Sequence, residues 1–204
     1  PPNMEGCLAR VFSGLEYPIT MLPDNFQPKL IIDLGANAGA TALYFHIHYP
    51  EAEIHCYEPS RLNLHYLEKN LRHAPNIVIH PYGILDKTCR IPLLTGARPS
   101  GAFSIHGDFY NQDDMSTHEM VDMKKASEEF ADSRFRKIHI LKMDVEECEF
   151  AILYDMFKDI ADLIIIFLFV EYHGHSQYTH IHRLLISEYE EVVICRSADE
   201  RQGT

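Results

Sequence analysis

Short apolar runs alternate with longer amphipathic stretches along most of this chain. The apolar runs predict strands at Leu30–Ile32, Glu53–Tyr57, Asn76–His80, Ile138–Met143, Ile164–Val170 and Glu191–Cys195. The stretches between them predict helices at Ala40–Tyr49, Arg61–Arg72, Phe150–Ile160 and Tyr178–Glu188. This alternation is typical of an α/β fold with a doubly wound, mainly parallel sheet. Because the run Ile164–Val170 is almost wholly apolar, we expect it in the centre of the sheet.

The stretch 86–135 interrupts this alternation after the third strand. Two runs, Arg90–Leu94 and Ala102–Ile105, flank a loop rich in glycine and proline and predict two short strands. The pattern S-x-x-E at 116–119 is a helix-start signal, and it predicts a helix that ends near Ala131. The apolar stripe of that helix would consist of Met120, Met123 and Phe130. We therefore expect a small insertion within the fold.

The first predicted strand leads directly into a turn of small residues, in the segment K-L-I-I-D-L-G-A-N-A-G-A-T at 29–41. Small side chains let the backbone approach a ligand closely, and the helix that follows begins with free N–H groups. A strand, a glycine turn and a helix form the opening unit of nucleotide-binding α/β domains. The turn residues that we expect to contact the ligand are Gly35, Ala36, Asn37 and Gly39.

The glycine spacing indicates which nucleotide this turn binds. A dinucleotide fingerprint reads G-x-G-x-x-G, whereas this turn reads G-x-x-x-G with Asn37 in place of the middle glycine. A phosphate-binding loop would end in Gly-Lys-Ser/Thr, and the lysine is missing. We expect Asp33 at the mouth of the turn, where its carboxylate would repel phosphate and attract an amine or a positive centre. S-adenosylmethionine carries an α-amino group and a sulfonium, and it has no phosphate.

An acidic residue follows the second predicted strand, in the sequence Glu58-Pro59-Ser60. Glu58 comes about 20 residues after the first turn, where nucleotide-binding α/β domains hold ribose hydroxyls. Pro59 ends the strand, and Ser60 is a good cap for the next helix. The sequence therefore predicts a cofactor pocket between these two strand ends.

Length, charge and cysteine content further limit the fold and the function that the sequence allows. The 204 residues suit one domain, 1–204, with a leading segment 1–28. The net charge of −12 argues against a nucleic-acid substrate, because no basic stripe is present to replace phosphate counterions. No apolar run approaches membrane-spanning length, and no secretory signal is visible. The five scattered cysteines lack a C-x-x-C pair and indicate reduced thiols in a cytoplasmic protein.

Four segments stand out when they are taken together: D-L-G-A-N-A-G at 33–39, E-P-S at 58–60, L-K-M-D-V-E-E-C-E at 141–149 and V-E-Y-H at 170–173. They resemble the FkbM family of class I S-adenosylmethionine-dependent methyltransferases, whose members mostly methylate oxygen atoms. The resemblance covers residues 28–175. It implies a Rossmann-like fold, S-adenosylmethionine as cofactor with S-adenosylhomocysteine as product, and a small-molecule or sugar acceptor.

The resemblance also implies roles for single residues. Asp144, at the end of the fourth strand, would face the transferred methyl group. Tyr82 and Gly83, in the turn after the third strand, would lie beside the adenine, next to Glu58 and Pro59. The family pattern D-V-E-G-x-E is matched at 144–149 except that Glu147 replaces the glycine.

The acceptor site has candidates from the insertion and from two strand ends. FkbM-like proteins carry such an insertion over the active site, so we expect residues 96–118, with His106, to line the acceptor pocket. Glu146 is a second candidate, although it would also suit the acidic first turn of a helix. Glu171 and His173 follow the fifth strand, and an extended chain would put both on one face. His173 would serve as general base for a hydroxyl, with a solvated strand-end histidine as the alternative.

A metal site is an alternative role for the same residues, because Asp144 with Glu171 or His173 could hold a divalent ion. We do not favour it. The chain has no H-E-x-x-H, and His46 and His48 would point apart on a helix.

The sequence thus predicts a methyltransferase that uses S-adenosylmethionine to methylate a hydroxyl. One alternative is a binding protein without catalysis, suggested by Glu147 and by the polar stretch after Glu191–Cys195, where the fold normally ends in a further strand. Another is a dinucleotide-dependent oxidoreductase, against which Asn37 and the G-x-x-x-G spacing argue. No motif identifies the acceptor or the oligomeric state.

Overall fold

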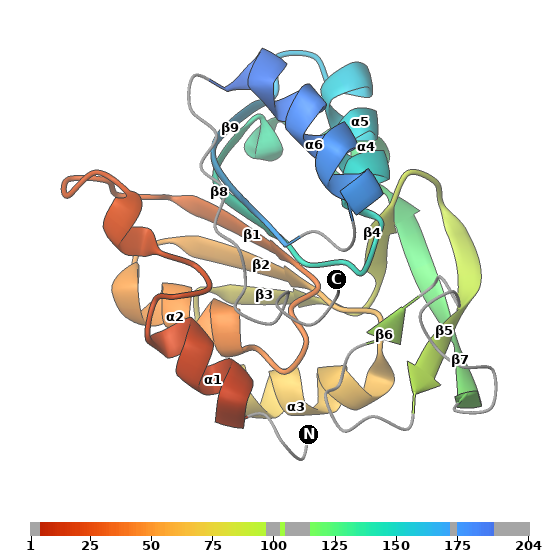
Figure 1. Cartoon of the computed structure of the whole chain (residues 1–204). Helices are drawn as coiled ribbons and strands as arrows, with labels where there is room; N and C mark the ends of the chain where they lie inside the picture. Colours follow the sequence, from red (N-terminus) through yellow and green to blue (C-terminus); the bar gives the residue numbers. More distant parts are fainter. Residues whose placement is uncertain (1–4, 97–102, 105–114, 172–174, 190–204) are drawn as a thin grey trace.

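The computed structural model describes residues 5–96, 103–104, 115–171 and 175–189. Its main feature is a five-stranded parallel sheet in the order β3-β2-β1-β8-β9 (Figure 1). The strands are β1 (Leu30–Leu34), β2 (Glu53–Tyr57), β3 (Ile77–His80), β8 (Lys137–Met143) and β9 (Ile164–Val170). The chain runs outward from β1 in one direction and then from β8 in the other. This order confirms the predicted doubly wound, mainly parallel sheet, and it creates a switch point between β1 and β8.

Helices cover both faces of this sheet (Figure 1). One face carries α1 (Glu5–Phe12), α2 (Ala40–His48) and α3 (Arg61–Leu71), and the other carries α5 (Glu149–Asp159) and α6 (His175–Glu188). Successive side chains of β1 serve different faces. Ile31 belongs to the apolar cluster of Phe45 and Leu67, whereas Ile32 belongs to that of Ile152 and Ile181. Because both faces of the sheet are covered, the period of two leaves every residue of β1 buried.

A second, four-stranded sheet follows β3, in the order β4-β7-β5-β6. It comprises β4 (Gly83–Leu85), β5 (Cys89–Gly96), β6 (Phe103–Ser104) and β7 (Met115–Lys125), and the short helix α4 (Ala126–Glu129) follows it. β5 and β6 confirm the two predicted strands of the insertion. The two remaining short elements are η1 (Ile19–Met21) and η4 (Ser133–Phe135).

The helix predicted from residue 116 to about Ala131 is wrong for most of its length, because β7 occupies 115–125. Val121 and Met123 are buried while Met120 and Asp122 are exposed, which is the period of a strand. β7 pairs antiparallel with β5 and parallel with β4, and this pairing outweighs the local capping signal. Glu119 does cap a helix, but a different one: both its carboxylate oxygens accept the backbone N–H of Arg61 at the start of α3, at 3.2 and 3.3 Å.

The expectation that Ile164–Val170 is central is also wrong for the described part of the chain, where β9 pairs with β8 alone and ends the sheet. Ile164 is accordingly 53% exposed. The predicted strand Glu191–Cys195 lies outside the described residues. Among the described helices, none has the length and apolar character needed to cross a membrane.

Candidate active site

The turn after β1 brings its backbone against the end of β8. Gly35, Asn37 and Gly39 all have positive φ, at 76°, 49° and 90°, a region that glycine reaches freely and asparagine tolerates. A Cβ on Gly35 would lie 1.9 Å from the carbonyl oxygen of Asp144, so no other residue fits there without moving that strand end. Gly39 begins α2 and packs against Leu67 and Leu71 of α3.

Glu58 holds this turn from the end of β2. Its side chain is 4% exposed, its Oε2 accepts the Asn37 N–H at 2.9 Å, and its Oε1 accepts the Ser60 N–H at 2.8 Å. Burial raises the pKa of Glu58 to about 7, although the two backbone donors oppose the shift. Each oxygen keeps a second lone pair, so the carboxylate can still accept ligand hydroxyls.

The turn after β8 is built differently. Glu146 and Glu147 have positive φ values of 51° and 79°, which costs a residue with a side chain about 1–2 kcal/mol each. Glu147, which stands where the FkbM pattern has glycine, thus lies in the left-handed region that glycine reaches freely. The buried Oε1 of Glu149 accepts the N–H groups of Val145 and Glu147, at 3.1 and 3.3 Å, and holds the turn closed. Asp144 N–H donates to the carbonyl of Leu34 at 3.1 Å, which joins the two turns.

A pocket lies between the two turns. The predicted residues that line it are Gly35, Asn37, Glu58, Pro59, Gly83, Asp144 and Glu146. Its wall carries three carboxyl groups, those of Glu58, Asp144 and Glu146, with no lysine or arginine among the described lining residues. The Oδ1 atoms of Asn37 and Asn63 are buried and have no hydrogen-bond partner among the described residues. The pocket therefore offers hydrogen-bond acceptors and negative charge.

The second sheet closes one end of this pocket through Leu93 and Met123. The Sδ and Cε of Met123 lie 2.6 Å from where a Cβ on Gly83 would stand. The cavity holds about 90 Å³, whereas small-molecule pockets usually hold roughly 300–1,000 Å³. A cofactor of nucleoside size therefore requires these side chains to move, and a methionine side chain, with three rotatable bonds, does so readily.

Asp33 lies inside β1 rather than at the mouth of the turn, which corrects its predicted position. It is 0% exposed, and the Nζ of Lys142 lies 3.0 Å from its Oδ1. The same Nζ donates to the carbonyls of Gly35 and Leu34, at 2.8 and 3.3 Å. Burial lowers the pKa of Lys142, but Asp33, Tyr17 and Asp144 together outweigh burial and the net shift is well upward, so the lysine is charged. Through its hydrogen bonds to these two carbonyls, Lys142 stabilises the start of the glycine turn, and Asp33 neutralises its charge.

Other predicted residues lie outside the pocket lining. Ala36 is buried, and the hydroxyl of Tyr82 donates to Glu129 at 2.8 Å, on the side of α4. Glu171 follows β9, and its N–H donates to the carbonyl of Met143 at 2.9 Å, next to Asp144. His106 and His173 lie outside the described residues. No group of three metal-ligating side chains occurs within the described part of the chain.

The sequence reasoning missed several pocket residues for identifiable reasons. Leu93 and Met123 come from the second sheet, and Met123 was assigned to a helix. Asn63 offered a signal in the sequence, since it is a polar residue in the first turn of the helix that follows Glu58, and the structure shows that it is buried. Lys142 had a signal too: a lysine inside a buried strand needs a buried carboxylate as its partner.

Comparison with known proteins adds a family and a fold. A family model for the methyltransferase FkbM domain matches residues 33–193. The crystal structure of a methyltransferase FkbM from Methylobacillus flagellatus KT is similar, with a TM-score of 0.59 and 19% sequence identity over 86% of this chain and 41% of that one. At this identity the likeness shows the fold alone. This chain spans less than half the length of that protein.

A weaker likeness is to a precorrin-6y C5,15-methyltransferase from Geobacter metallireducens GS-15, with a TM-score of 0.43 and 11% identity over 89% of this chain and 70% of that one. At this score it carries no argument about the present chain. No match was found among curated proteins.

Proposed function

The chain belongs to the FkbM methyltransferase family, and from this premise we propose that it transfers the methyl group of S-adenosylmethionine to a hydroxyl group of a small molecule or sugar. When bound, this cofactor supplies an electrophilic methyl group on a sulfonium. The observation that carries the proposal is the charge of the pocket, where Asp144 and Glu146, together with the buried carboxyl of Glu58, face no lysine or arginine among the described lining residues. Such a wall attracts a cationic ligand and repels a pyrophosphate, which argues against a dinucleotide oxidoreductase.

The polar groups of the pocket suit the nucleoside part of this cofactor. Glu58 would accept ribose hydroxyls beside its two backbone donors, with Pro59 and Gly83 beside the adenine. The unpartnered Oδ1 atoms of Asn37 and Asn63 would accept the remaining hydroxyl or amine protons. Gly35 would let the backbone of the turn approach the ligand, because it has no Cβ.

The chemistry that we assign to the protein is alignment and proton removal. Asp144 lies at the switch point, where α/β sheets bind their ligands, and would orient the acceptor hydroxyl and take up its proton. Glu146 and Glu171, with His106, would bind the acceptor, and His173 is the second candidate for the base. A binding protein without catalysis remains the competing proposal, but Glu147 gives it less support because its φ of 79° lies in the left-handed region that a glycine reaches freely.

The first test of the proposed function is which cofactor the chain binds. Titration calorimetry should show that the chain binds S-adenosylmethionine and S-adenosylhomocysteine but not NAD. Preferential binding of NAD would refute the proposal. Methyl transfer from labelled S-adenosylmethionine to a panel of sugars and hydroxylated small molecules then separates an enzyme from a binding protein.

Asp144→Asn tests the catalytic assignment. It should keep S-adenosylhomocysteine affinity within a few-fold and lower turnover by about 10²–10⁴-fold, the usual contribution of a general base. Glu147→Gln is the matched control in the same turn, since Glu147 is not among the residues that line the pocket. Unchanged turnover in Asp144→Asn would mean that the residue is structural.

A further inference from the structure

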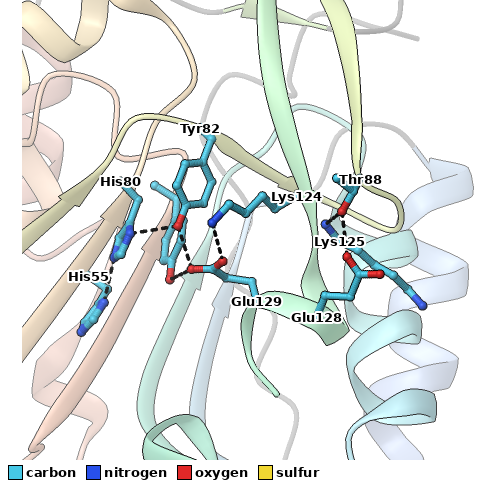
Figure 2. A network of polar contacts seen from close by, with 9 residues as sticks. His55, His80, Tyr82, Thr88, Lys124, Lys125, Glu128 and Glu129 are labelled. Carbon is cyan, nitrogen blue, oxygen red and sulfur yellow. Dashed lines mark hydrogen bonds and ion pairs between the residues drawn. The ribbon is translucent and has the colours of Figure 1, made fainter. Parts of the chain in front are cut away.

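A chain of polar side chains runs from β2 to the second sheet (Figure 2). Of its members, Tyr57 lines the pocket. Glu53 and His55 of β2 are linked at 2.6 Å, and His55 Nδ1 and His80 Nε2 at 2.9 Å. His80 Nδ1 lies 3.1 Å from the hydroxyl of Tyr82, which donates to Glu129 of α4 at 2.8 Å. The network thus joins β2, the end of β3 and the element that follows the second sheet.

Glu129 is the point where this network branches. The Oε1 atom accepts both the Tyr82 hydroxyl and, at 3.2 Å, the Tyr57 hydroxyl. The Oε2 atom pairs with Lys124 of β7 at 3.1 Å, and the Lys124 ammonium lies 3.9 Å from the ring centre of Tyr82. The Glu129 side chain is 12% exposed, so these contacts are largely shielded from water.

The hydrogen-bond directions in this network are fixed by its donors. Tyr82 has one hydroxyl proton, and it donates this proton in its hydrogen bond to Glu129. His80 must therefore donate to the Tyr82 oxygen through Nδ1. Burial lowers the pKa of His80 to about 4, so its ring is neutral at pH 7 and Nε2 accepts from His55. Every donor from His55 onward therefore points toward Glu129, which makes this carboxylate the terminal acceptor.

Three members of the network each fix one part of the pocket wall. Tyr57 lines the pocket, and its carbonyl accepts the N–H groups of Gly35 and Ala36 in the glycine turn, at 3.0 and 3.1 Å. Tyr82 directly precedes Gly83, which also lines the pocket. Lys124 directly follows Met123, the side chain that packs over Gly83. One carboxylate outside the parallel sheet thus restrains three pocket-lining residues from separate elements.

We propose that Glu129 is a positioning residue that sets the shape of the nucleoside end of the cofactor pocket by holding Tyr57, Tyr82 and Lys124. This inference rests on the proposed cofactor, because the nucleoside end is the part of the pocket next to Glu58, Pro59 and Gly83. Glu129 itself touches no ligand. Its contribution is to keep the two tyrosines and β7 in a fixed arrangement before the cofactor binds, which lowers the entropy lost on binding.

The experiment compares Glu129→Ala and Glu129→Gln by calorimetric titration with S-adenosylhomocysteine and with 5′-methylthioadenosine, which lacks the amino-acid part. Glu129→Ala leaves both tyrosine hydroxyls without their acceptor, so both ligands should bind about tenfold more weakly. Glu129→Gln keeps an amide oxygen for the two hydroxyls and should restore most of the affinity. Tyr82→Phe and Tyr57→Phe, which remove one hydroxyl each, should give intermediate losses.

Glu128→Ala is the matched control, since Glu128 lies on the same helix and accepts a hydrogen bond from Thr88, in the loop between β4 and β5, at 2.9 Å, but contacts no tyrosine of the network (Figure 2). It should leave both affinities unchanged. Unchanged binding in Glu129→Ala, or an equal loss in Glu128→Ala, would overturn the proposal. A wild-type protein that binds neither ligand would instead refute the proposed cofactor, and this inference would fall with it.

Discussion

Two turns meet at the edge of the parallel sheet, and different residues form the left-handed backbone in each. The glycine turn, 35–39, and the acidic turn, 144–149, each include left-handed backbone, and each is held by one buried carboxylate. Glu58 accepts one N–H group of the first turn and one from Ser60, whereas Glu149 accepts two N–H groups of the second turn. In the first turn the left-handed residues are Gly35, Asn37 and Gly39. In the second they are Glu146 and Glu147, which reach this region only at a cost.

The difference follows from what each turn presents to the pocket. The glycine turn presents backbone, and Gly35 must come so close to Asp144 that even a methyl group is excluded. The acidic turn presents side chains, since Asp144 and Glu146 both line the pocket. Strained backbone that is kept next to a binding pocket is a feature of functional sites. The comparison therefore separates a turn selected for close approach from one selected for its carboxylates.

The largest effect is expected from Gly35→Ala, which breaks the contact between the turns. The new Cβ would lie 1.9 Å from the Asp144 carbonyl, and φ is +76°, so we expect a loss of about 4 kcal/mol or more in unfolding free energy. Gly14→Ala is the control, because Gly14 has φ +70° but only one neighbour, the Tyr44 hydroxyl at 3.4 Å. Urea denaturation of both variants measures the difference. Equal losses would show that the contact with Asp144 is unimportant.

The second prediction concerns the carboxylate that holds the glycine turn. The folded-state pKa of Glu58 is about 7, above its ordinary value of 4.5, so the folded state binds the proton more tightly than the unfolded state does. The stability that this proton adds to the folded state is present below pH 4.5 and is lost as the pH rises through 7. We expect the stability of Glu58→Gln relative to wild type to increase by about 3 kcal/mol between pH 4.5 and pH 8. Denaturation at several pH values measures this. If the difference in unfolding free energy between Glu58→Gln and wild type does not change with pH, the pKa of Glu58 is not raised.

The third prediction tests the carboxylate of the acidic turn. Glu149→Ala leaves the N–H groups of Val145 and Glu147 without their acceptor, which should cost about 2 kcal/mol of unfolding free energy. Glu149→Gln keeps one amide oxygen and should cost less. Thermal unfolding of the two variants measures the order. If both lose the same amount, charge rather than backbone support is what Glu149 contributes.

The smallest expected effect is a gain, rather than a loss, of unfolding free energy. Glu147→Gly relieves the strain at φ 79° and should raise the unfolding free energy by roughly 0.5–1 kcal/mol, because the gain exceeds the added entropy of the unfolded chain. Asp162→Gly, at φ 59° between α5 and β9, is the control for strain away from the pocket. The same urea titrations apply. A destabilised Glu147→Gly would mean that the glutamate side chain, rather than its backbone, holds the turn.

The sequence by itself determined the elements whose signals are local. β1, β2 and β9 were marked by short apolar runs, α2 by the glycine turn before it, and α3 by the cap Ser60, whose Oγ accepts the Asn63 N–H. Because parallel strands end at one edge, the ends of β1, β2 and β8 fixed the place of the pocket. Six of the predicted site residues line it for this reason, and Gly83 joins them from the start of β4.

Only the tertiary structure decided the contacts that join distant segments. Asp33 could be read as a ligand-facing carboxylate until Lys142, 109 positions later, proved to be its partner. Glu119 shows the same limit, since it caps α3 from a strand that local signals predict to be a helix. The first turn of Glu119's own predicted helix and the first turn of the distant α3 offer its carboxylate the same kind of N–H group, and sequence spacing cannot tell which donor is near. Long-range strand pairing made that choice, because β7 gains more from β4 and β5 than a lone helix turn provides.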